Sequence, residues 1–525
     1  MLEREVKLVA TPDLVLPDLA DAVPGAALGA PEERPIDDTY FDTVDLRLAR
    51  WGCTVRFRMG DGWTVKLPVP GTGRVLARQE IVLGGEPGNP PAEVVALVRP
   101  LTRGASLGLV ARFDTARTVR RWTDAEGTMV AELVDDRVTA EVPADVSGEP
   151  ASVAWRELEV ELGPDARAKV ARRIAKRLDR AVAAADPGGE TAEIGGVTTG
   201  GVTGGPDDPR PKLVRAIGPA AEGDADVVEV RLGSAPTARQ VIAAAISRST
   251  IRLMLHLPAA RLGHDIEGVH QARVATRRLR SDLRTFRPLL DREWAAALSE
   301  QLRWLADDLG KVRDTDVLSQ RLAGIVEARP DLAGDGTRRV LASLERRRKR
   351  ESTALLDHLD SERADRVLDQ LVAAGADPRT TPEADGPARE LIEPLVARRW
   401  KRVDRAVLAL DDPPVVDDLH RARILAKRAR YAAEAARPAA RRKTADDLKT
   451  LARSMARLQD QLGELNDAAV AEAFLAGLAA RAKGETAFAA GRMCQIVNDE
   501  AAARGVGWQR HHRRASKAAR RLGWR

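Results

Sequence analysis

Aromatic side chains are scarce in this 525-residue sequence, at 3% of residues, and cysteine occurs only as Cys53 and Cys494. Few aromatics argue against binding of single-stranded nucleic acid, which relies on rings that stack with bases. Two distant cysteines indicate no disulfide framework and fit a reducing compartment. No apolar run approaches the roughly 20 residues that span a bilayer, and the charged beginning, MLEREVKLVA, lacks the apolar core of a signal peptide. We therefore expect a cytoplasmic protein with no membrane partner.

Charge is nearly balanced, with 84 basic and 78 acidic residues and a formal net charge of +6. So small a total says little about partners unless charges of one sign gather in particular segments. Hydrophobic residues make up 44% of the chain and charged residues 31%, as in globular proteins. A chain of this length exceeds what one hydrophobic core usually organises, so we expect two or three domains.

The chain divides into three segments of different pattern. Residues 1–185 show the period-two alternation of strands in LEREVKLVA, CTVRFRMG, WTVKLP, RQEIVLG and WRELEVEL, with a helical pattern after the last. Residues 186–226, rich in Gly, Thr and Pro, have little to bury and are predicted to be a linker. Residues 227–525 show helical periodicity. The predicted class is α+β multidomain, a strand-rich part followed by an all-α part.

The helical part contains an internal repeat. VHQARVATRRLRSDLRTF matches LHRARILAKRARYAAEAA, which places His270 and His420 150 positions apart. Downstream, LADDLGKVRDTDVL matches LQDQLGELNDAAVA, with Gly310 and Gly463 153 positions apart. Matching passages in the same order at nearly the same offset predict two similar helical bundles related by a pseudo-twofold axis.

Each repeat carries a stripe of cations on one predicted helix. The stripes are His270, Arg273, Arg277, Arg280, Arg284 and Arg287, and His420, Arg423, Lys427, Arg430, Arg437 and Arg441, the second interrupted by Glu434. The spacing of the first places all six side chains within a sector of roughly 100°. Solvated faces usually mix signs, because like charges at this spacing repel. Arginine also pairs bidentately with phosphate, so a polyanion is the favoured ligand. The alternative is a solvated face with histidines that only pack or cap.

Carboxylates alternate with apolar residues on the predicted strands. The residues that share a strand face are Glu3, Glu5 and Lys7 in the first strand and Glu157, Glu159 and Glu161 in the last. If these two strands pair, their carboxylates crowd together unless cations lie between them. Mg²⁺ binds oxygen ligands of this kind and bridges them to phosphates. The alternative is a polar outer face of a sheet.

The repeated helix, with the turn LGKVRDTD that follows it, resembles the conserved-histidine α-helical domain, CHAD, over about residues 230–520. The resemblance implies two pseudo-symmetric four-helix bundles around a basic channel that binds inorganic polyphosphate. It assigns to polyphosphate the residues His270, Arg273, Arg277, Arg280, Arg284, His420, Arg423, Lys427 and Arg430, with Arg428 and Tyr431 as weaker candidates. Asp314 and Asp467, in the matched turns, are expected to cap helices or to order the arginines.

The opening motif EREVK, followed in order by TYFDT, TVRFR, VKLP and ELEVEL, resembles the CYTH or triphosphate-tunnel family over about residues 1–183. The resemblance implies an antiparallel eight-stranded tunnel. It assigns catalysis to Glu3, Glu5 and Lys7, and metal binding to Glu3, Glu5, Glu157 and Glu159. Triphosphate binding falls to Arg56, Arg58, Lys66, Arg78, Arg112 and Arg117. Which arginine of TARTVRRW fills the family's basic position stays open, as does the register of Glu132 against Asp135; Asp136 follows directly.

Together the resemblances imply an inorganic triphosphatase or short-chain polyphosphatase that uses Mg²⁺, or Mn²⁺ in its place, and captures polyphosphate with its helical part. The glutamates would hold the metal that activates a water, while the basic residues stabilise the developing charge. Inorganic polyphosphate or tripolyphosphate is the expected partner, nucleic acid is not, and association with polyphosphate granules is expected of the helical part. The alternatives are a polyphosphate-binding protein without turnover, and adenylate cyclisation or thiamine triphosphate hydrolysis.

Overall fold

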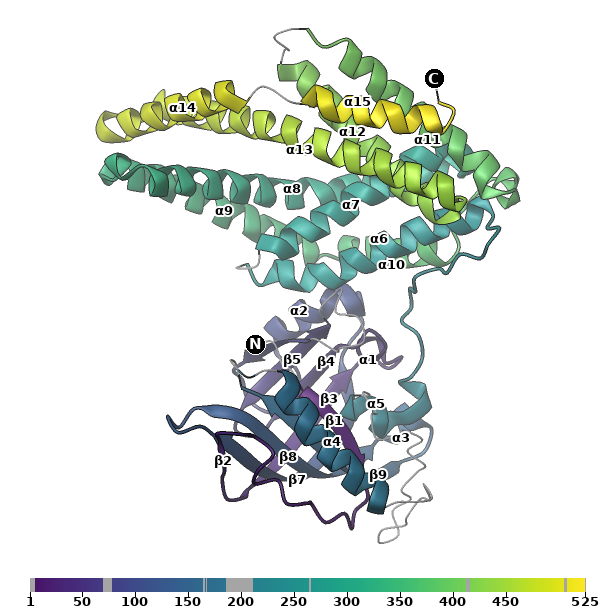
Figure 1. The fold of residues 1–525 in the computed structure, drawn as a ribbon, viewed down its shortest axis with the longest axis vertical. Coiled ribbons are helices and arrows are strands. Elements are labelled where there is room, and N and C mark those ends of the chain that lie inside the picture. The colour runs from purple at the N-terminus through teal and green to yellow at the C-terminus, as the bar shows by residue number, and fades with distance from the viewer. Residues whose placement is uncertain are drawn as a thin grey trace. The chain divides into compact units, whose positions relative to one another are not determined.

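The computed structural model describes residues 5–68, 78–163, 166, 168–185, 211–263, 266–411, 416–504 and 508–524. Two compact units, Met1–Asp226 and Val227–Arg525, divide the chain (Figure 1). The first is built on an antiparallel sheet and the second is helical, which confirms the predicted α+β class. Within the described ranges no helix is long and apolar enough to span a bilayer.

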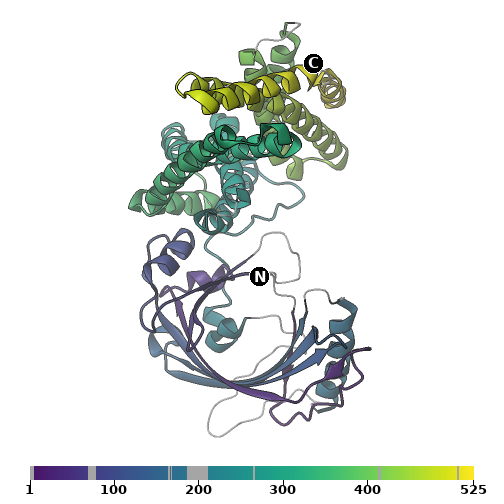
Figure 2. The ribbon, with the colours of Figure 1, turned by 90° about the vertical axis from the view of Figure 1, so that its left-hand side faces the viewer.

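One antiparallel sheet forms the centre of the first unit. Its strands are β1 (Glu5–Ala10), β2 (Ala27–Leu28), β3 (Glu32–Asp42), β4 (Thr54–Arg58), β5 (Gly62–Pro68), β6 (Arg78–Leu83), β7 (Gly108–Thr123), β8 (Met129–Val142) and β9 (Ala151–Leu162). Neighbouring strands follow the order β1-β9-β8-β7-β3-β4-β5-β6, and the short β2 pairs with β7 off this path. The eight-stranded antiparallel arrangement is thus confirmed. Figure 2 shows the sheet edge-on as a deep curve, with a concave and a convex face.

The first and last long strands of the unit are neighbours. β1 pairs with β9 so that Glu5 lies opposite Glu161 and Lys7 lies opposite Glu159. This pairing is the condition under which the sequence predicts crowded carboxylates. The register left open by the sequence is also defined, because Glu132 lies opposite Glu161 and Asp136 lies opposite Glu157.

An amphipathic helix, α4 (Ala168–Ala185), covers the convex face. Its Ile174 and Leu178 are fully buried in a cluster with Leu8, Leu133 and Leu158 of the sheet. Each such side chain contributes about 1.5–3 kcal/mol on burial. Since side chains alternate along a strand, the residues next to Leu158 on β9, Glu157 and Glu159, point to the concave face.

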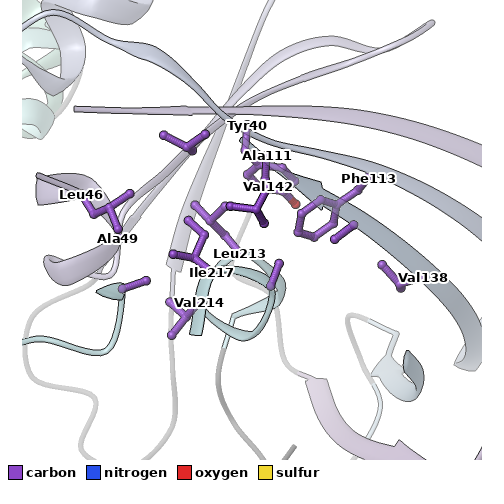
Figure 3. Packing of buried hydrophobic residues seen from close by; sticks show 14 of the residues in the cluster. Tyr40, Leu46, Ala49, Ala111, Phe113, Val138, Val142, Leu213, Val214 and Ile217 are labelled. Atoms are coloured by element: carbon purple, nitrogen blue, oxygen red, sulfur yellow. The ribbon is translucent and has the colours of Figure 1, made fainter. Parts of the chain in front are cut away.

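A short helix, α5 (Lys212–Ile217), packs on the concave face and belongs to the first unit. Figure 3 shows Leu213, Val214 and Ile217 of this helix against Tyr40 and Phe113 of the sheet. The helix lies inside residues 186–226, which the composition predicts to be a linker. A run of apolar residues, LVRAI, follows the Gly- and Pro-rich stretch and supplies the buried face that the rest of the segment lacks.

The smaller helices of the first unit are α1 (Arg47–Arg50), α2 (Ala92–Thr102) and α3 (Ala144–Ser147). The helices of the second unit are α6 (Ala238–Arg261), α7 (Ile266–Phe286), α8 (Arg292–Ala328), α9 (Asp335–Leu359), α10 (Glu362–Ala376), α11 (Ala388–Leu408), α12 (Val416–Ala436), α13 (Arg442–Ala479), α14 (Gly484–Arg504) and α15 (Trp508–Arg521). Each repeat contributes five of the described α-helices in the same order. α7 matches α12 at 21 residues, and α8 with 37 residues matches α13 with 38.

Reciprocal hydrogen bonds join the beginnings of the two repeats. The N–H of Ala238 donates to the carbonyl of Gly386 at 3.0 Å, and the N–H of Ala388 donates to the carbonyl of Pro236 at 3.0 Å. Each donor is 150 positions from its counterpart, the same offset as between the histidines. This exchange is what a pseudo-twofold axis between two repeats requires, so the predicted internal symmetry is confirmed.

The far ends of the long helices share one core. Leu322 of α8, Val340 of α9, Leu475 of α13 and Met493 of α14 are fully buried in a single cluster. Both repeats contribute two helices to it, and Figure 1 shows the four helices running together. The two repeats therefore share one hydrophobic core where these four helices meet.

Candidate functional site

Three buried carboxylates meet on the concave face of the sheet. Asp136 of β8 and Glu157 and Glu159 of β9 each place a carboxylate oxygen within 4.8 Å of the others. Their exposed fractions are 0%, 1% and 3%. Asp136 and Glu157 face each other across the β8–β9 pair, so the register of the sheet creates the cluster. Three carboxylates that are this close together and this deeply buried repel one another strongly unless cations neutralise them.

Cations from two elements surround the carboxylates. Arg117 of β7 donates from Nε and Nη2 to the two oxygens of Asp136 at 2.8 and 2.7 Å, and lies 3.7 Å from Glu159. The Lys212 Nζ atom lies 3.0 Å from Glu157 Oε1 and 3.8 Å from Glu159 Oε1, and also pairs with Asp136. The α5 helix thus inserts an ammonium group among all three acids.

Glu157 is held by further contacts on the α5 side. Arg215 donates from Nη1 to Glu157 Oε2 at 2.6 Å, and the indole of Trp155 donates to the same oxygen at 3.0 Å. Both side chains are buried, so they fix the orientation of the carboxylate. Burial opposes the charge of Arg117, but the acids around it raise its pKa overall.

A second set of cations lies on β4 and β5. Arg58 donates from Nε and Nη2 to the two oxygens of Asp38 at 2.7 and 2.8 Å, and Arg56 donates to Asp38 at 3.1 Å. Lys66 lies 3.8 Å from Glu80. Burial works against the charge of Asp38, but Arg58, Arg56 and the charge of Lys212 together lower its pKa. Because Lys212 acts on both Asp38 and the three-carboxylate cluster, the two sets share one concave surface.

The structure gathers only part of the predicted tunnel site. Arg56, Arg58, Lys66, Arg117, Glu157 and Glu159 lie on this surface. Glu3 is outside the described residues, and the side chains of Glu5, Lys7 and Arg78 are not described, although their backbones lie in β1 and β6. Arg112 is exposed, five residues from Arg117 and so on the opposite face of β7, where it lines a groove with Glu141. That position removes Arg112 from the set.

The sequence did not single out three residues of this site, one carboxylate of the cluster and two cations that contact it. Asp136 is one of three acids in the segment Glu132–Asp136 between which the sequence did not choose, and only the strand register selects it. Lys212 and Arg215 lie in the segment predicted to be a linker. The pairing of a basic residue with the apolar run LVRAI is the one signal that could have identified them.

The chemistry of the cluster fits a divalent metal ion. All donors are carboxylate oxygens, which Mg²⁺ and Mn²⁺ prefer, and no imidazole or thiolate takes part among the described residues. Asp136, Glu157 and Glu159 are the residues that would hold such an ion, with Asp136 in addition to the predicted Glu157 and Glu159.

A second candidate site lies between the two repeats of the helical unit. It is a pocket of about 460 Å³ between α7, α8, α12 and α13. Its basic lining residues are His270, Arg273, Arg277, Arg313, Arg321, His420, Arg423 and Lys427. The two carboxylates in the lining are Asp314 and Asp467. Six of the nine predicted polyphosphate residues therefore line one pocket.

The pocket is built twice from the same parts. Arg273 donates to the carbonyl of Gly310 at 3.1 Å and to Asp314 at 2.6 Å. In the other repeat Arg423 lies 4.0 Å from Asp467, and a side chain at Gly463 would reach its guanidinium. The expectation that Asp314 and Asp467 order the arginines agrees with this geometry. The stripe is therefore not free of carboxylate partners, because the long helices α8 and α13 supply one to each repeat.

Several cations of the pocket are destabilised in their charged form. Burial, followed by the charges of Arg277, Arg423 and Arg273, lowers the pKa of Lys427 to about 7. Burial and Arg313 lower the pKa of His270, and burial lowers that of Arg423 despite Asp467. A protein that keeps such a cluster carries an electrostatic cost that an anion would relieve.

The other predicted residues of the stripe lie beyond the pocket lining. Burial lowers the pKa of both Arg399 and Arg428 to about 10, with the charge of Arg402 next for Arg399 and those of Arg284 and Arg280 next for Arg428. Arg430 instead donates to Glu434 at 2.8 Å. Tyr431 accepts a hydrogen bond from Arg277 Nε at 3.1 Å, which links it to the pocket. Arg313, Arg321 and Gln459 line the pocket from α8 and α13, outside the helices that carry the stripe, and were missed for that reason.

Comparison with known proteins matches both parts of the chain. The family model of the CYTH domain matches residues 1–183, and that of the CHAD domain matches residues 244–476. The uncharacterized protein Rv2226 of Mycobacterium tuberculosis (strain ATCC 25618 / H37Rv) is 30% identical over 498 residues, which is 90% of this chain and 89% of that protein. The uncharacterized protein MT2285 of strain CDC 1551 / Oshkosh matches to the same extent.

Among solved structures, the CHAD domain from the plant Ricinus communis is 24% identical with a TM-score of 0.46, over 55% of this chain and 95% of that one. PptA from Streptomyces chartreusis is 22% identical with a TM-score of 0.42, over 54% of this chain and 99% of that one. The domain matches and the relatives aligned along nearly the whole chain agree with the curved sheet and the two-repeat helical unit. The chain belongs to the family of proteins in which a CYTH domain is fused to a CHAD domain.

Proposed function

We propose that the chain is a metal-dependent hydrolase of inorganic triphosphate or short polyphosphate, whose CHAD domain captures polyphosphate. The observation that carries the proposal is the buried cluster of Asp136, Glu157 and Glu159 on the same concave surface as Arg56 and Arg58. Acids that can hold a metal beside cations that can hold phosphate oxygens are the parts that phosphoryl transfer needs.

The protein groups would divide the work as follows. Asp136, Glu157 and Glu159 would hold a divalent ion, which would supply Lewis acidity and a bound water of lowered pKa. Arg56, Arg58 and Lys66 are placed to hold the oxygens of the phosphate chain. Arg117 and Arg215 fix the orientation of the carboxylates through the hydrogen bonds described above.

Lys212 has a distinct place in this proposal. Its ammonium group neutralises the three acids in the structure, at 3.0 Å from Glu157 and 3.8 Å from Glu159. With a metal ion held by the three acids, the ammonium group would be placed to pair with phosphate oxygens on the same surface. It would then stabilise the charge that develops on the leaving phosphate.

The helical pocket supports capture and not turnover. Its basic lining residues far outnumber its two carboxylates, and among the described residues no cluster suited to a metal lies in the helical unit. Arginine and lysine bind phosphate oxygens without contacting a nucleobase, so a pocket of this kind suits an inorganic phosphate chain.

The test is a turnover assay with the full chain. Tripolyphosphate, long-chain polyphosphate, ATP and thiamine triphosphate are incubated with and without Mg²⁺, and release of phosphate or pyrophosphate is followed. We expect metal-dependent release from tripolyphosphate or polyphosphate. The Glu159→Gln and Asp136→Asn variants should lose at least about 100-fold in rate, since even outer partners of a metal site are worth about 10–100-fold.

Glu141→Gln is the matched control, because Glu141 is an exposed carboxylate on the other face of the same strand as Asp136. It should keep full activity. Loss of activity in this control as well would show that the effect is general destabilisation. Absence of turnover of every substrate by the parent chain, with polyphosphate binding retained, would refute the hydrolase and leave a binding protein; turnover of ATP or thiamine triphosphate alone would point to the other tunnel chemistries.

A further inference from the structure

The last helix of the chain carries cations of one sign only. Residues 508–524 contain no aspartate or glutamate, and six basic residues of α15 are exposed. They are Arg510, Arg513, Arg514, Lys517, Arg520 and Arg521. The formal net charge of the entire chain is +6, so these six charges alone equal it. This helix therefore carries a strong local excess of positive charge.

The helix sorts its residues onto two faces. His511, Ala515, Ala518 and Ala519 are buried against the neighbouring helices, while the cations occupy the opposite side. Their spacing of three and four residues lines them up along about 16 Å of helix. Figure 1 shows α15 lying along α13 on the outside of the helical unit. We define the exposed cations of α15 as the α15 basic face.

The α15 basic face has almost no compensating acids. In the described part of the chain Arg521 pairs with Asp447 at 3.2 Å, and Arg513, Arg514 and Lys517 have no carboxylate within ion-pair distance. Other exposed helices mix signs, as where Arg366 pairs with Glu362 on α10. Stacked like charges disfavour a helix, so this face is not an ordinary solvated surface. The positive charge also acts on the buried side of the helix, since burial and the charge of Arg510 lower the pKa of His511.

The side chains of the face define the kind of partner. Among the described residues none of the strongly exposed large apolar side chains belongs to α15, so nothing on it would enter a bilayer. Trp508 is only partly exposed and Trp524 is buried, so no aromatic platform awaits a base. What remains is a row of guanidinium and ammonium groups, which matches a repeating phosphate anion.

The face is separate from the pocket between the repeats. Gln459, Asp467 and Val470 of α13 line the pocket, whereas Arg457 of the same helix lies near His511 of α15. Residues 457 and 459 point about 200° apart on a helix, so the two surfaces flank α13 on different sides. A short phosphate chain can fill the pocket without touching the face, but a long chain can reach both.

We infer that the α15 basic face is a second polyphosphate-binding surface, which engages chains too long for the pocket and makes the protein prefer long polyphosphate. The inference rests on the proposed capture of polyphosphate by the CHAD domain. Two linked contacts raise affinity without any change in the pocket, because the second contact forms at a high effective concentration.

The experiment compares two chain lengths on the full chain with a metal chelator present. The α15 triple variant is Arg513→Gln/Arg514→Gln/Lys517→Gln. The matched control is Arg346→Gln/Lys349→Gln/Arg350→Gln, which removes from α9 three exposed cations that have no ion-pair partner among the described residues. Affinities for tripolyphosphate, for long-chain polyphosphate and for duplex DNA are measured by titration at low and at physiological ionic strength, and thermal melts verify that both variants fold.

We expect the α15 triple variant to bind long polyphosphate roughly 5- to 10-fold more weakly at low salt and tripolyphosphate unchanged, with the α9 control equal to the parent. Equal affinity of parent and α15 triple variant for long chains would overturn the inference. Equal losses in both triple variants would overturn it too, since the effect would then be net charge alone. A loss confined to duplex DNA would overturn it in favour of nucleic acid.

Failure of the proposed function gives a different pattern. The pocket variant Arg277→Gln/Arg423→Gln should weaken both chain lengths, because both residues line the pocket. If that variant binds both lengths as the parent does while the α15 triple variant loses long chains, the pocket proposal fails, and the α15 basic face remains as a polyphosphate-binding surface by itself.

Discussion

We predict that the proposed capture of polyphosphate depends on pH through the charge state of Lys427. Burial and the charges of Arg277, Arg423 and Arg273 lower the pKa of Lys427 from 10.5 to about 7 in the free protein. Phosphate oxygens in the pocket would favour the ammonium form and raise that pKa again. Binding above pH 7 therefore takes up a proton, and affinity should fall as the pH rises.

The size of the effect follows from the shift. Below pH 7 the side chain is already charged, so pH changes little at Lys427. Above pH 7 each pH unit costs about 1.4 kcal/mol of binding free energy, roughly tenfold in Kd, until the pKa of the complex is reached. The pH dependence of folding has the opposite sign in the free protein. Between about pH 7 and 10.5 Lys427 is protonated in the unfolded chain but neutral in the folded one. The free energy of unfolding therefore rises across that window.

The assay is a titration of the full chain with long-chain polyphosphate at pH 6.5, 7.5 and 8.5, at constant ionic strength and with a chelator. Long chains are used because terminal phosphates titrate near pH 6 and long chains have few of them. Calorimetry in two buffers of different ionisation enthalpy counts the protons taken up. The matched variant is Lys427→Arg, which keeps the charge at every pH used.

We expect parent affinity to fall about tenfold between pH 7.5 and 8.5, with uptake approaching one proton, and the Lys427→Arg variant to be nearly flat. A parent as flat as the arginine variant would refute the reasoning. Lys427 would then either be charged in the free protein or remain remote from the bound phosphate.

Two further predictions concern packing and buried charge. Gly310→Ala should raise the free energy of unfolding by about 0.5–1 kcal/mol, because alanine favours a helix and the added Cβ meets only Arg273 at 3.9 Å. Gly336→Ala should lower the free energy of unfolding by about 1–3 kcal/mol, because the added Cβ would clash with the carbonyl oxygen of Glu485. Denaturant melts measure both, and equal effects would contradict the contact geometry. Burial raises the pKa of Asp282 to about 8. The contribution of Asp282 to the free energy of unfolding is therefore fully present below pH 4 and is lost as the pH rises towards 8. Asp282→Asn should flatten that loss in melts between pH 5 and 8, and an unchanged slope would show that Asp282 is ionised when buried.

Much of the fold could be predicted because local pattern and tertiary structure agree. The alternation of β1, β4, β5, β6 and β9 is visible in the sequence, and the repeat at an offset of 150 gave the internal symmetry that Ala238 and Ala388 confirm. α5 could not be predicted in this way. It is six residues long and follows a stretch of Gly and Pro, and only the concave face of the sheet gives its apolar residues something to pack against.

The site residues that could be predicted are those that share one helix face. His270, Arg273 and Arg277 repeat at helical spacing, so their common face could be predicted from the sequence alone. Asp136 could not, because three acids within five residues fit the pattern and only the pairing of β8 with β9 selects one. Lys212 is contributed across a long sequence separation, and residues brought together by topology leave no periodic signal.

The position of α5 also decides where this chain can be divided. A fragment that stops at residue 185, near the end of the CYTH match, would lose Lys212 and uncover the apolar cluster that Leu213 and Ile217 close. Asp226 is still tied to the sheet-bearing half, since it accepts a hydrogen bond from the indole of Trp51 at 3.0 Å. Expression of the two halves as separate proteins should therefore break the chain after Asp226, and an inactive product of the shorter fragment would say nothing about the activity of the tunnel.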